Sequence, residues 1–193
     1  GDDLNDNPDN YFIFGEGNSY GLELFFKRRT GRLTGWIGYT WSKTERWFDE
    51  VDNGNPFPAK YDRRHDVSVT ATYSLNERWT FGMVFVYATG NTTTLPIGRY
   101  VIDGQIVNEY GPRNSFRLDP YHRLDLSVTY VLKKSGKWTS DLNLSVYNVY
   151  NRKNPYFIYF FYEGNVDEGS FRTVARQVSL IPILPALTWN FSF

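Results

Sequence analysis

Alternation of apolar and polar residues runs through much of the chain and restricts the possible fold more than any other feature. From Arg123 to Tyr130, leucine, valine and tyrosine occupy the even positions, and charged or hydroxyl side chains occupy the odd ones. Residues 66–75, 79–87 and 141–147 follow the same period. Since successive side chains of a β-strand point to opposite faces, this period predicts strands with unlike faces. As helices, the same segments would scatter their apolar residues around the axis, so we expect almost no helix.

Short and long connections separate these strands in turn. The short ones are rich in glycine, asparagine and lysine, as tight turns are, and comprise residues 30–32, 76–77 and 133–137. The long ones are polar, hold most of the proline, and comprise roughly residues 48–64, 90–120 and 162–170. The regular alternation of short and long connections predicts an antiparallel up-and-down meander, with short turns at one end of the sheet and long loops at the other.

Two architectures produce such alternation. In a soluble sandwich or small barrel the apolar face points into a packed core. In a transmembrane barrel the apolar face meets lipid and the polar face lines a wet interior. Tryptophan and tyrosine stand where short turns meet strands, at Tyr73, Trp79, Tyr130 and Trp138. These rings suit a membrane–water boundary, and the strands exceed the usual length in soluble sheets. We favour the barrel and keep a soluble β-sandwich binding module as an alternative.

Charge and cysteine content exclude several classes of protein. Lys plus Arg and Asp plus Glu both number 21, so the formal net charge is zero, which argues against nucleic-acid binding. The chain has no cysteine, which excludes disulfide frameworks and thiol catalysis. No run approaches the roughly 18 consecutive apolar residues of a transmembrane helix. Residues 1–10 are acidic and amide-rich, so they suggest a loop and not a signal peptide.

The last eight residues alternate cleanly and end on an aromatic ring. Leu187, Trp189, Phe191 and Phe193 share one face, and Phe193 is the final residue. This pattern resembles the C-terminal strand of bacterial outer-membrane proteins, which the barrel-assembly machinery reads. The resemblance implies that Trp189, Phe191 and Phe193 form an assembly signal.

Several stretches together resemble the C-terminal β-barrel portion of a TonB-dependent outer-membrane receptor of the Bacteroidota type. They are SYGLEL at 19–24, GWIGYTWSKTER at 35–46, YDRRHDV at 61–67, YHRLDL at 121–126, YNVYNRKNPYF at 147–157 and RQVSLIPILPALTWNFSF at 176–193. Such receptors are similar in plan, with a barrel of about 22 strands around a plug. The resemblance implies that residues 1–193 are a C-terminal barrel segment, with the plug domain and the N-terminal barrel strands absent.

The resemblance also implies a function, a location and a set of partners. The whole receptor would take up a scarce nutrient through the bacterial outer membrane with energy from TonB, and this segment would supply wall, extracellular loops and assembly signal. The implied partners are outer-membrane lipid, the rest of the barrel and the plug, TonB through the missing N-terminal region, the barrel-assembly machinery and, as a further candidate, a surface lipoprotein. A passive outer-membrane porin or an adhesion barrel would show the same strand pattern and remains the alternative.

Seven long strands follow from the alternation and the resemblance together. We expect them at residues 19–29, 33–48, 64–75, 78–90, 121–132, 138–160 and 171–193. Pro182 and Pro185 invite a turn, but the final phenylalanine belongs at the rim of the short turns. We therefore expect one continuous last strand with a bulge at these prolines. Seven strands leave two edges unpaired in lipid, so a missing part of the sequence, another chain or detergent must cover these edges.

The sequence offers little chemistry. In residues 61–66 a salt-bridge cluster at the rim is a better explanation than catalysis, and alternation places His122 and Asp125 on opposite faces. Residues 3–7 imitate a calcium loop but lack its glycine and its final glutamate, and residues 49–52 suggest a solvated acidic loop. We assign no catalytic residue, cofactor or metal ligand and do not expect an enzyme.

Aromatic residues of the long loops are the candidate ligand surface. Phe57, Tyr100, Tyr110 and Phe116 suit stacking on a sugar, a chelate ring or a partner protein, or alternatively pack on neighbouring loops. On the polar face we expect Glu23, Lys27, Arg123 and Asp125 to form ladders across neighbouring strands.

Overall fold

The computed structural model of the protein describes residues 12–102, 105–136, 138–164 and 172–193. In this part of the chain every regular element is a β-strand except a 3₁₀ turn at Asp52–Gly54, which confirms the all-β prediction. No helix among the described residues has the length and apolarity needed to cross a membrane. The chain divides into two compact units: one from the segments 1–22, 41–64 and 91–118, the other from 23–40, 65–90 and 119–193.

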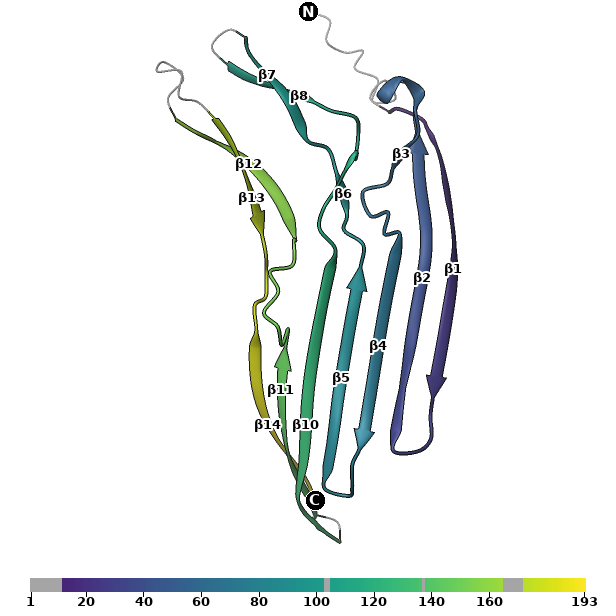
Figure 1. Cartoon of the computed structure of the whole chain (residues 1–193), viewed down its shortest axis with the longest axis vertical. Helices are drawn as coiled ribbons and strands as arrows, with labels where there is room; N and C mark the ends of the chain where they lie inside the picture. Colours follow the sequence, from purple (N-terminus) through teal and green to yellow (C-terminus); the bar gives the residue numbers. More distant parts are fainter. Residues whose placement is uncertain (1–11, 103–104, 137, 165–171) are drawn as a thin grey trace, which may run out of the picture. The chain divides into compact units, whose positions relative to one another are not determined.

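Seven long strands form one sheet (Figure 1). Their order is β1 (Glu16–Arg28), β2 (Leu33–Trp47), β4 (His65–Ser74), β5 (Trp79–Ala88), β10 (Tyr121–Ser135), β11 (Trp138–Tyr147) and β14 (Leu184–Ser192), and β3 (Phe57–Pro58) pairs with β2. Each long strand therefore neighbours the long strands before and after it in the chain. The predicted antiparallel meander of seven strands is confirmed.

The register of the second unit aligns apolar residues with apolar residues. Leu144 of β11 lies opposite Val128 of β10 and Leu187 of β14. The next residue, Ser145, lies opposite Ser127 and Ala186. The same alternation continues to β5 and β4, where the opposed pairs include Leu126 with Met83, Leu124 with Phe85, and Val69 with Phe85. One face of this sheet is therefore continuously apolar, as the period of two predicts.

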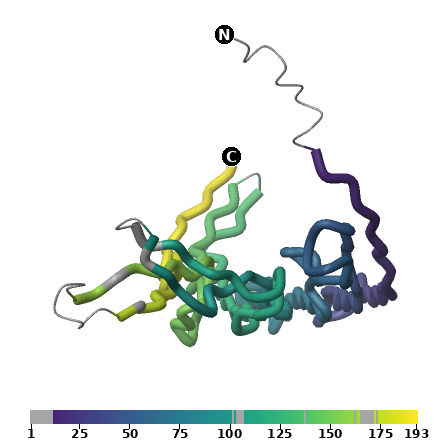
Figure 2. The backbone as a smooth tube through the Cα atoms, turned by 90° about the horizontal axis from the view of Figure 1, so that it is seen from above, coloured from purple at the N-terminus to yellow at the C-terminus, as the bar shows by residue number. Residues whose placement is uncertain are grey.

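No second layer covers this apolar face in the described part of the second unit. Of the residues in β4, β5, β10, β11 and β14, Ala88 alone is buried. Leu126 and Leu144 are 41% and 48% exposed, and Trp189 is 63% exposed. These strands thus form a single layer and lack the closed core of a soluble sandwich. Figure 2 shows β14, in yellow, running beside the green strands β10 and β11.

The last two predicted strands are interrupted, which corrects the expectation of continuous strands at 138–160 and 171–193. After β11 and before β14, β12 (Phe157–Glu163) pairs with β13 (Arg172–Val178). Between the two paired regions, nine residues on one side, 148–156, face five on the other, 179–183. The cause is local backbone: Asn148 and Asn151 have φ of 54° and 53°, outside the strand region. The nested pairing contains no reversal at Pro182, as predicted.

The long segment 90–120 holds short paired strands of its own. β6 (Thr92–Thr93) pairs with β9 (Phe116–Arg117), and β7 (Pro96–Ile102) pairs with β8 (Gln105–Tyr110), both antiparallel. These pairs belong to the first unit, together with the loop that contains the 3₁₀ turn. They position the candidate site.

Candidate functional site

A buried carboxylate, Asp62, fixes the loops of the first unit. Its side chain is fully buried, and the backbone N–H of Thr44 donates to Oδ1 at 2.7 Å. The guanidinium groups of Arg117 and Arg64 donate to Oδ2 at 2.7 and 3.2 Å. Arg117 also donates to the Asp62 carbonyl oxygen. One residue thus joins β2, β9 and the loop before β4.

The surroundings of Asp62 keep it ionised. Burial raises the pKa of this carboxyl, but the hydrogen bonds from Thr44, Arg117 and Arg64 outweigh burial and lower the pKa below its ordinary value. The predicted salt-bridge cluster in residues 61–66 is confirmed for Asp62 and Arg64. The contact with Arg117, 55 residues further along, has no local signal in the sequence and was not predicted.

Further hydrogen bonds attach the segment 91–118 to the loop 48–64. The backbone N–H of Arg113 donates to Oδ2 of Asp52 at 2.7 Å, and the Asn114 amide donates to the Pro58 carbonyl at 2.9 Å. The buried Thr92 hydroxyl donates to the Ala59 carbonyl at 2.9 Å. Side chains and backbone groups far apart in sequence therefore hold the two loops as one body.

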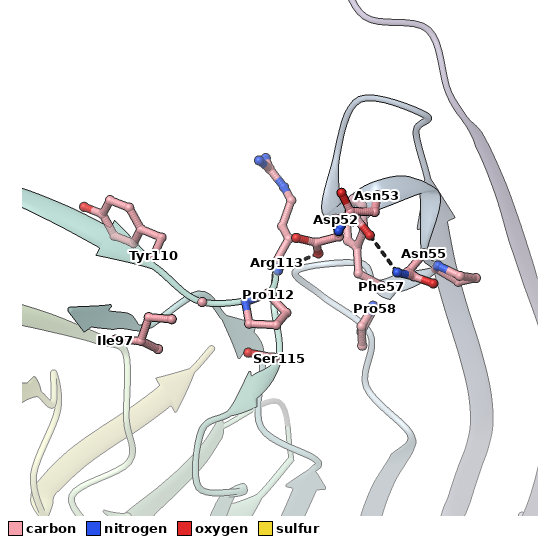
Figure 3. A pocket seen from close by; sticks show the side chains of 12 residues that line it. Asp52, Asn53, Asn55, Phe57, Pro58, Ile97, Tyr110, Pro112, Arg113 and Ser115 are labelled. Atoms are coloured by element: carbon pink, nitrogen blue, oxygen red, sulfur yellow. Dashed lines mark hydrogen bonds between the residues drawn. The ribbon is translucent and has the colours of Figure 1, made fainter.

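A hollow of about 390 Å³ lies between these joined loops. Its lining comprises Asp52, Asn53, Asn55, Pro56, Phe57, Pro58, Ile97, Tyr110, Gly111, Pro112, Arg113 and Ser115. In Figure 3, Ile97 and Tyr110 lie on one side of the hollow, and Phe57 and Pro58 lie on the other. The lining thus combines ring and proline surfaces with the Asp52 carboxylate, two side-chain amides, two hydroxyls and a guanidinium.

The structure brings two of the four predicted aromatic residues to this hollow. Phe57 is 5% exposed and stacks on Phe48, with ring centroids 6.0 Å apart. Tyr110 is 61% exposed and presents its ring to solvent. Tyr100 of β7 donates from its hydroxyl to Oε2 of Glu109, and Phe116 lies on β9. The last two do not line the hollow.

The polar lining of the hollow was not predicted from the sequence. The Arg113 guanidinium lies over the Phe57 ring at 5.8 Å, and the amide of Asn55 donates to the Asp52 carbonyl. Asp52 and Asn53 have φ of 50° and 55°, the left-handed conformation that aspartate and asparagine tolerate best. The turn residues around Asn53 and Gly111–Pro112 were the available signal, but they do not reveal that the two turns meet.

The polar face of the second unit carries a cross-strand cluster around Arg123. Its guanidinium donates to the Tyr147 hydroxyl at 2.6 Å and to the Tyr121 hydroxyl at 3.1 Å, and it pairs with Asp125 at 3.0 Å. Asp125 also accepts the backbone N–H of Asn148, which is fully buried. The predicted ladder is confirmed for Arg123, which reaches from β10 to β11. For Glu23 and Lys27 it stays a prediction.

The described residues contain no group of three or more His, Asp or Glu side chains placed to hold a metal ion. The imitation of a calcium loop at residues 3–7 lies outside the described residues. In the acidic loop 49–52, the Asp52 carboxylate is already the acceptor for Arg113.

The rings of the expected assembly signal lie at the end of the sheet. Trp189 and Phe191 of β14 are exposed, and Phe193 packs on Trp138 with ring centroids 5.5 Å apart. The Trp189 indole N–H donates to the Ser140 hydroxyl at 2.8 Å. The structure places these rings at one end of the sheet, and their role as an assembly signal stays a prediction.

A family model described as TonB dependent receptor-like, beta-barrel matches residues 1–151. The chain belongs to this family. The TonB-dependent receptors are receptors and transporters of the Gram-negative outer membrane, and the resemblance found in the sequence is confirmed. Neither the curated proteins nor the solved structures contain a match to the chain.

Proposed function

We propose that the chain is the C-terminal wall segment of a TonB-dependent active transporter in a bacterial outer membrane, of the Bacteroidota type. The observation that carries this proposal is the single-layer sheet of the second unit, whose apolar residues align in register and stay exposed. In water such a large exposed apolar face would be unfavourable and would promote aggregation, whereas in a bilayer it contacts hydrocarbon chains. The polar face, with Arg123 and Asp125, then lines the interior.

Strand length and the sheet edges support the same interpretation. β4, β5 and β11 have 10 residues each, which is close to the length that crosses a bilayer when tilted. β1 and β14 are the two edge strands of the sheet. In hydrocarbon, each unpaired backbone N–H or C=O group of such an edge costs several kcal/mol. We infer that the remaining strands of a barrel of about 22 pair with these edges and that a plug fills the interior.

Transport can be tested while the cargo is still unidentified. The organism is grown in a defined medium, and solutes remaining in the medium are measured for the wild type, a strain lacking the receptor and a strain lacking TonB. We expect the same solute to persist in both deletion strains. A solute that persists only without the receptor would identify a passive pore, and unchanged depletion in every strain would contradict transport.

We propose that the loop hollow belongs to the ligand-facing surface. Tyr110 offers an exposed ring, and Arg113, Asn53 and Asn55 offer donors around it. This combination suits a small solute with one flat apolar face and several acceptors, such as a sugar ring or a chelate. In the intact receptor, Tyr110→Ala should slow uptake of the identified solute, whereas Tyr61→Ala, on an exposed ring outside the hollow, should not.

We further propose that Trp189, Phe191 and Phe193 act as the signal for barrel assembly. The support is the exposure of Trp189 and Phe191 on β14 and of Phe193 directly after it, where a partner protein can reach them. Phe193→Ala should lower the amount of folded receptor in outer membranes, and Phe193→Tyr should restore it. Equal amounts for both variants would contradict a role for the terminal ring.

A further inference from the structure

The two histidines of the chain lie at the same end of the apolar face. His65 is the first residue of β4 and His122 the second of β10, each where the chain returns from a long loop. Both continue the apolar alternation, since His65 comes two residues before Val67 and His122 two before Leu124. Tyr87 of β5 lies opposite both Val67 and His122. Polar rings therefore end an otherwise apolar surface.

A tyrosine hydroxyl orients each imidazole. The Tyr39 hydroxyl lies 2.9 Å from Nδ1 of His65, and the Tyr150 hydroxyl lies 2.8 Å from Nδ1 of His122. Tyr39 stacks on His65, and Tyr87 stacks on His122, with interplanar angles of 20° and 22°. A hydroxyl that donates to Nδ1 leaves the imidazole proton on Nε2. Each ring is held at Nδ1 by one tyrosine hydroxyl, and its second nitrogen, Nε2, has no partner in the described part of the chain.

A guanidinium group is fixed beside one of these imidazoles. Oδ1 of Asn154 accepts the backbone N–H of His122 at 2.9 Å and Nε of Arg152 at 3.2 Å. Arg152 also donates to the Pro120 carbonyl at 3.0 Å, so its position is held from two sides. Through Asn154, a guanidinium group is thus held beside His122, at the end of the apolar row that continues with Leu124. That combination matches a phosphate attached to acyl chains.

We propose that His122, Tyr150 and Arg152, with His65 and Tyr39 as a second position, bind the phosphate groups of lipid headgroups in the outward-facing leaflet. The proposal rests on the proposed function, because it requires the apolar face to lie in a bilayer with the long loops outside. The Nε2–H and the guanidinium donate to phosphate oxygens, and the acyl chains follow the apolar face. No proton transfer or covalent step is involved.

Lipid binding to the full-length receptor tests the proposal. The probes are bisphosphorylated lipid A, the same lipid with its phosphates removed, and inorganic phosphate, each titrated into purified receptor and detected by native mass spectrometry. We expect His122→Phe, which keeps a ring for stacking, and Tyr150→Phe each to weaken binding of the phosphorylated lipid about tenfold. Tyr73→Phe is the matched control, because Tyr73 lies on the same face at the opposite end of β4.

Three results would overturn the headgroup site. They are equal binding of the dephosphorylated lipid, unchanged binding by His122→Phe, and inorganic phosphate that displaces the lipid at equal concentration, which would indicate a free-anion site. Failure of the proposed function itself has a different signature. A receptor whose apolar face does not meet lipid would not insert into vesicles of any composition, whichever variant is used.

Discussion

A lysine at Leu144 tests whether the apolar face lies in hydrocarbon. Leu144 is 48% exposed in the middle of the apolar row formed with Val128 and Leu187. Its neighbour Ser145 points to the other face, between Ser127 and Ala186. Leu144→Lys and Ser145→Lys place the same charge on adjacent residues of one strand. If the assignment of faces is correct, the two variants differ strongly in their free energy of unfolding.

The geometry sets the expected size of the effect. Leu144 lies six residues beyond Trp138, the first residue of β11. At about 3.3 Å per residue and about 45° of tilt, this separation corresponds to about 14 Å along the membrane normal, near the middle of the roughly 25 Å apolar band. A lysine there costs about 2–4 kcal/mol, or about 30- to 1,000-fold in the folding equilibrium. A lysine at Ser145 faces the polar interior and should stay within about 0.5 kcal/mol.

The assay is guanidinium unfolding of the full-length receptor in vesicles, followed by the gel mobility of the unheated folded barrel. A third variant, Leu144→Trp, separates lipid from a packed protein core. Overpacking a core costs about 1–3 kcal/mol, whereas fluid acyl chains accommodate the larger ring. The assignment of faces would be refuted if Ser145→Lys were as damaging as Leu144→Lys, or if Leu144→Trp were strongly destabilising.

Three further predictions concern buried polar residues. Asp62→Asn weakens the pairing with Arg117 and Arg64, whose side chains are about a third exposed, and should destabilise the loops by about 1–3 kcal/mol. Faster proteolysis of the loops would show this loss, and Asp49→Asn, at an exposed carboxylate, is the control. Folding lowers the pKa of Asp62, so its ionised form stabilises the folded loops. This stabilisation is complete above the unfolded-state pKa of about 4 and is lost as pH falls through the lower pKa of the folded state. Protection of the loops from an acid protease should therefore fall in that pH range, and it should depend less on pH in Asp62→Asn. Asn148→Ala loses the side-chain hydrogen bonds to Arg152 and Ile181 and puts alanine at positive φ, so it should lower the free energy of guanidinium unfolding by about 2–4 kcal/mol. Asn148→Gly loses the same bonds without the strain at positive φ and should cost about 1 kcal/mol less.

The wall of the barrel was predictable because its signals are local. Alternation in residues 66–75 and 123–130 assigns each side chain to a face, whichever strand lies beside it. The tight turns then place consecutive strands side by side. The order of the seven strands and the absence of a reversal at Pro182 follow from these two signals and the resemblance.

The break after β11 was not predictable, because distant groups stabilise it. Asn148 leaves the strand conformation, and its backbone N–H then bonds to Asp125, 23 residues earlier. Its amide donates to the carbonyls of Arg152 and Ile181, the latter 33 residues away. Asparagine in a sequence such as YNVYN fits a strand end or a turn equally well. Only these long-range bonds decide between them.

The loop hollow shows the same limit of prediction, and the residues around it divide into two roles. Asp62, Thr92 and Asn114 fix the loops through partly or fully buried bonds. Arg113 contributes its backbone N–H to Asp52, so its side chain is not needed for that bond. Tyr110 is exposed and likewise leaves the fixed bonds untouched. Substitutions at Arg113 and Tyr110 can therefore change the lining of the hollow while the loops keep their positions, which is the arrangement that the proposed ligand surface requires.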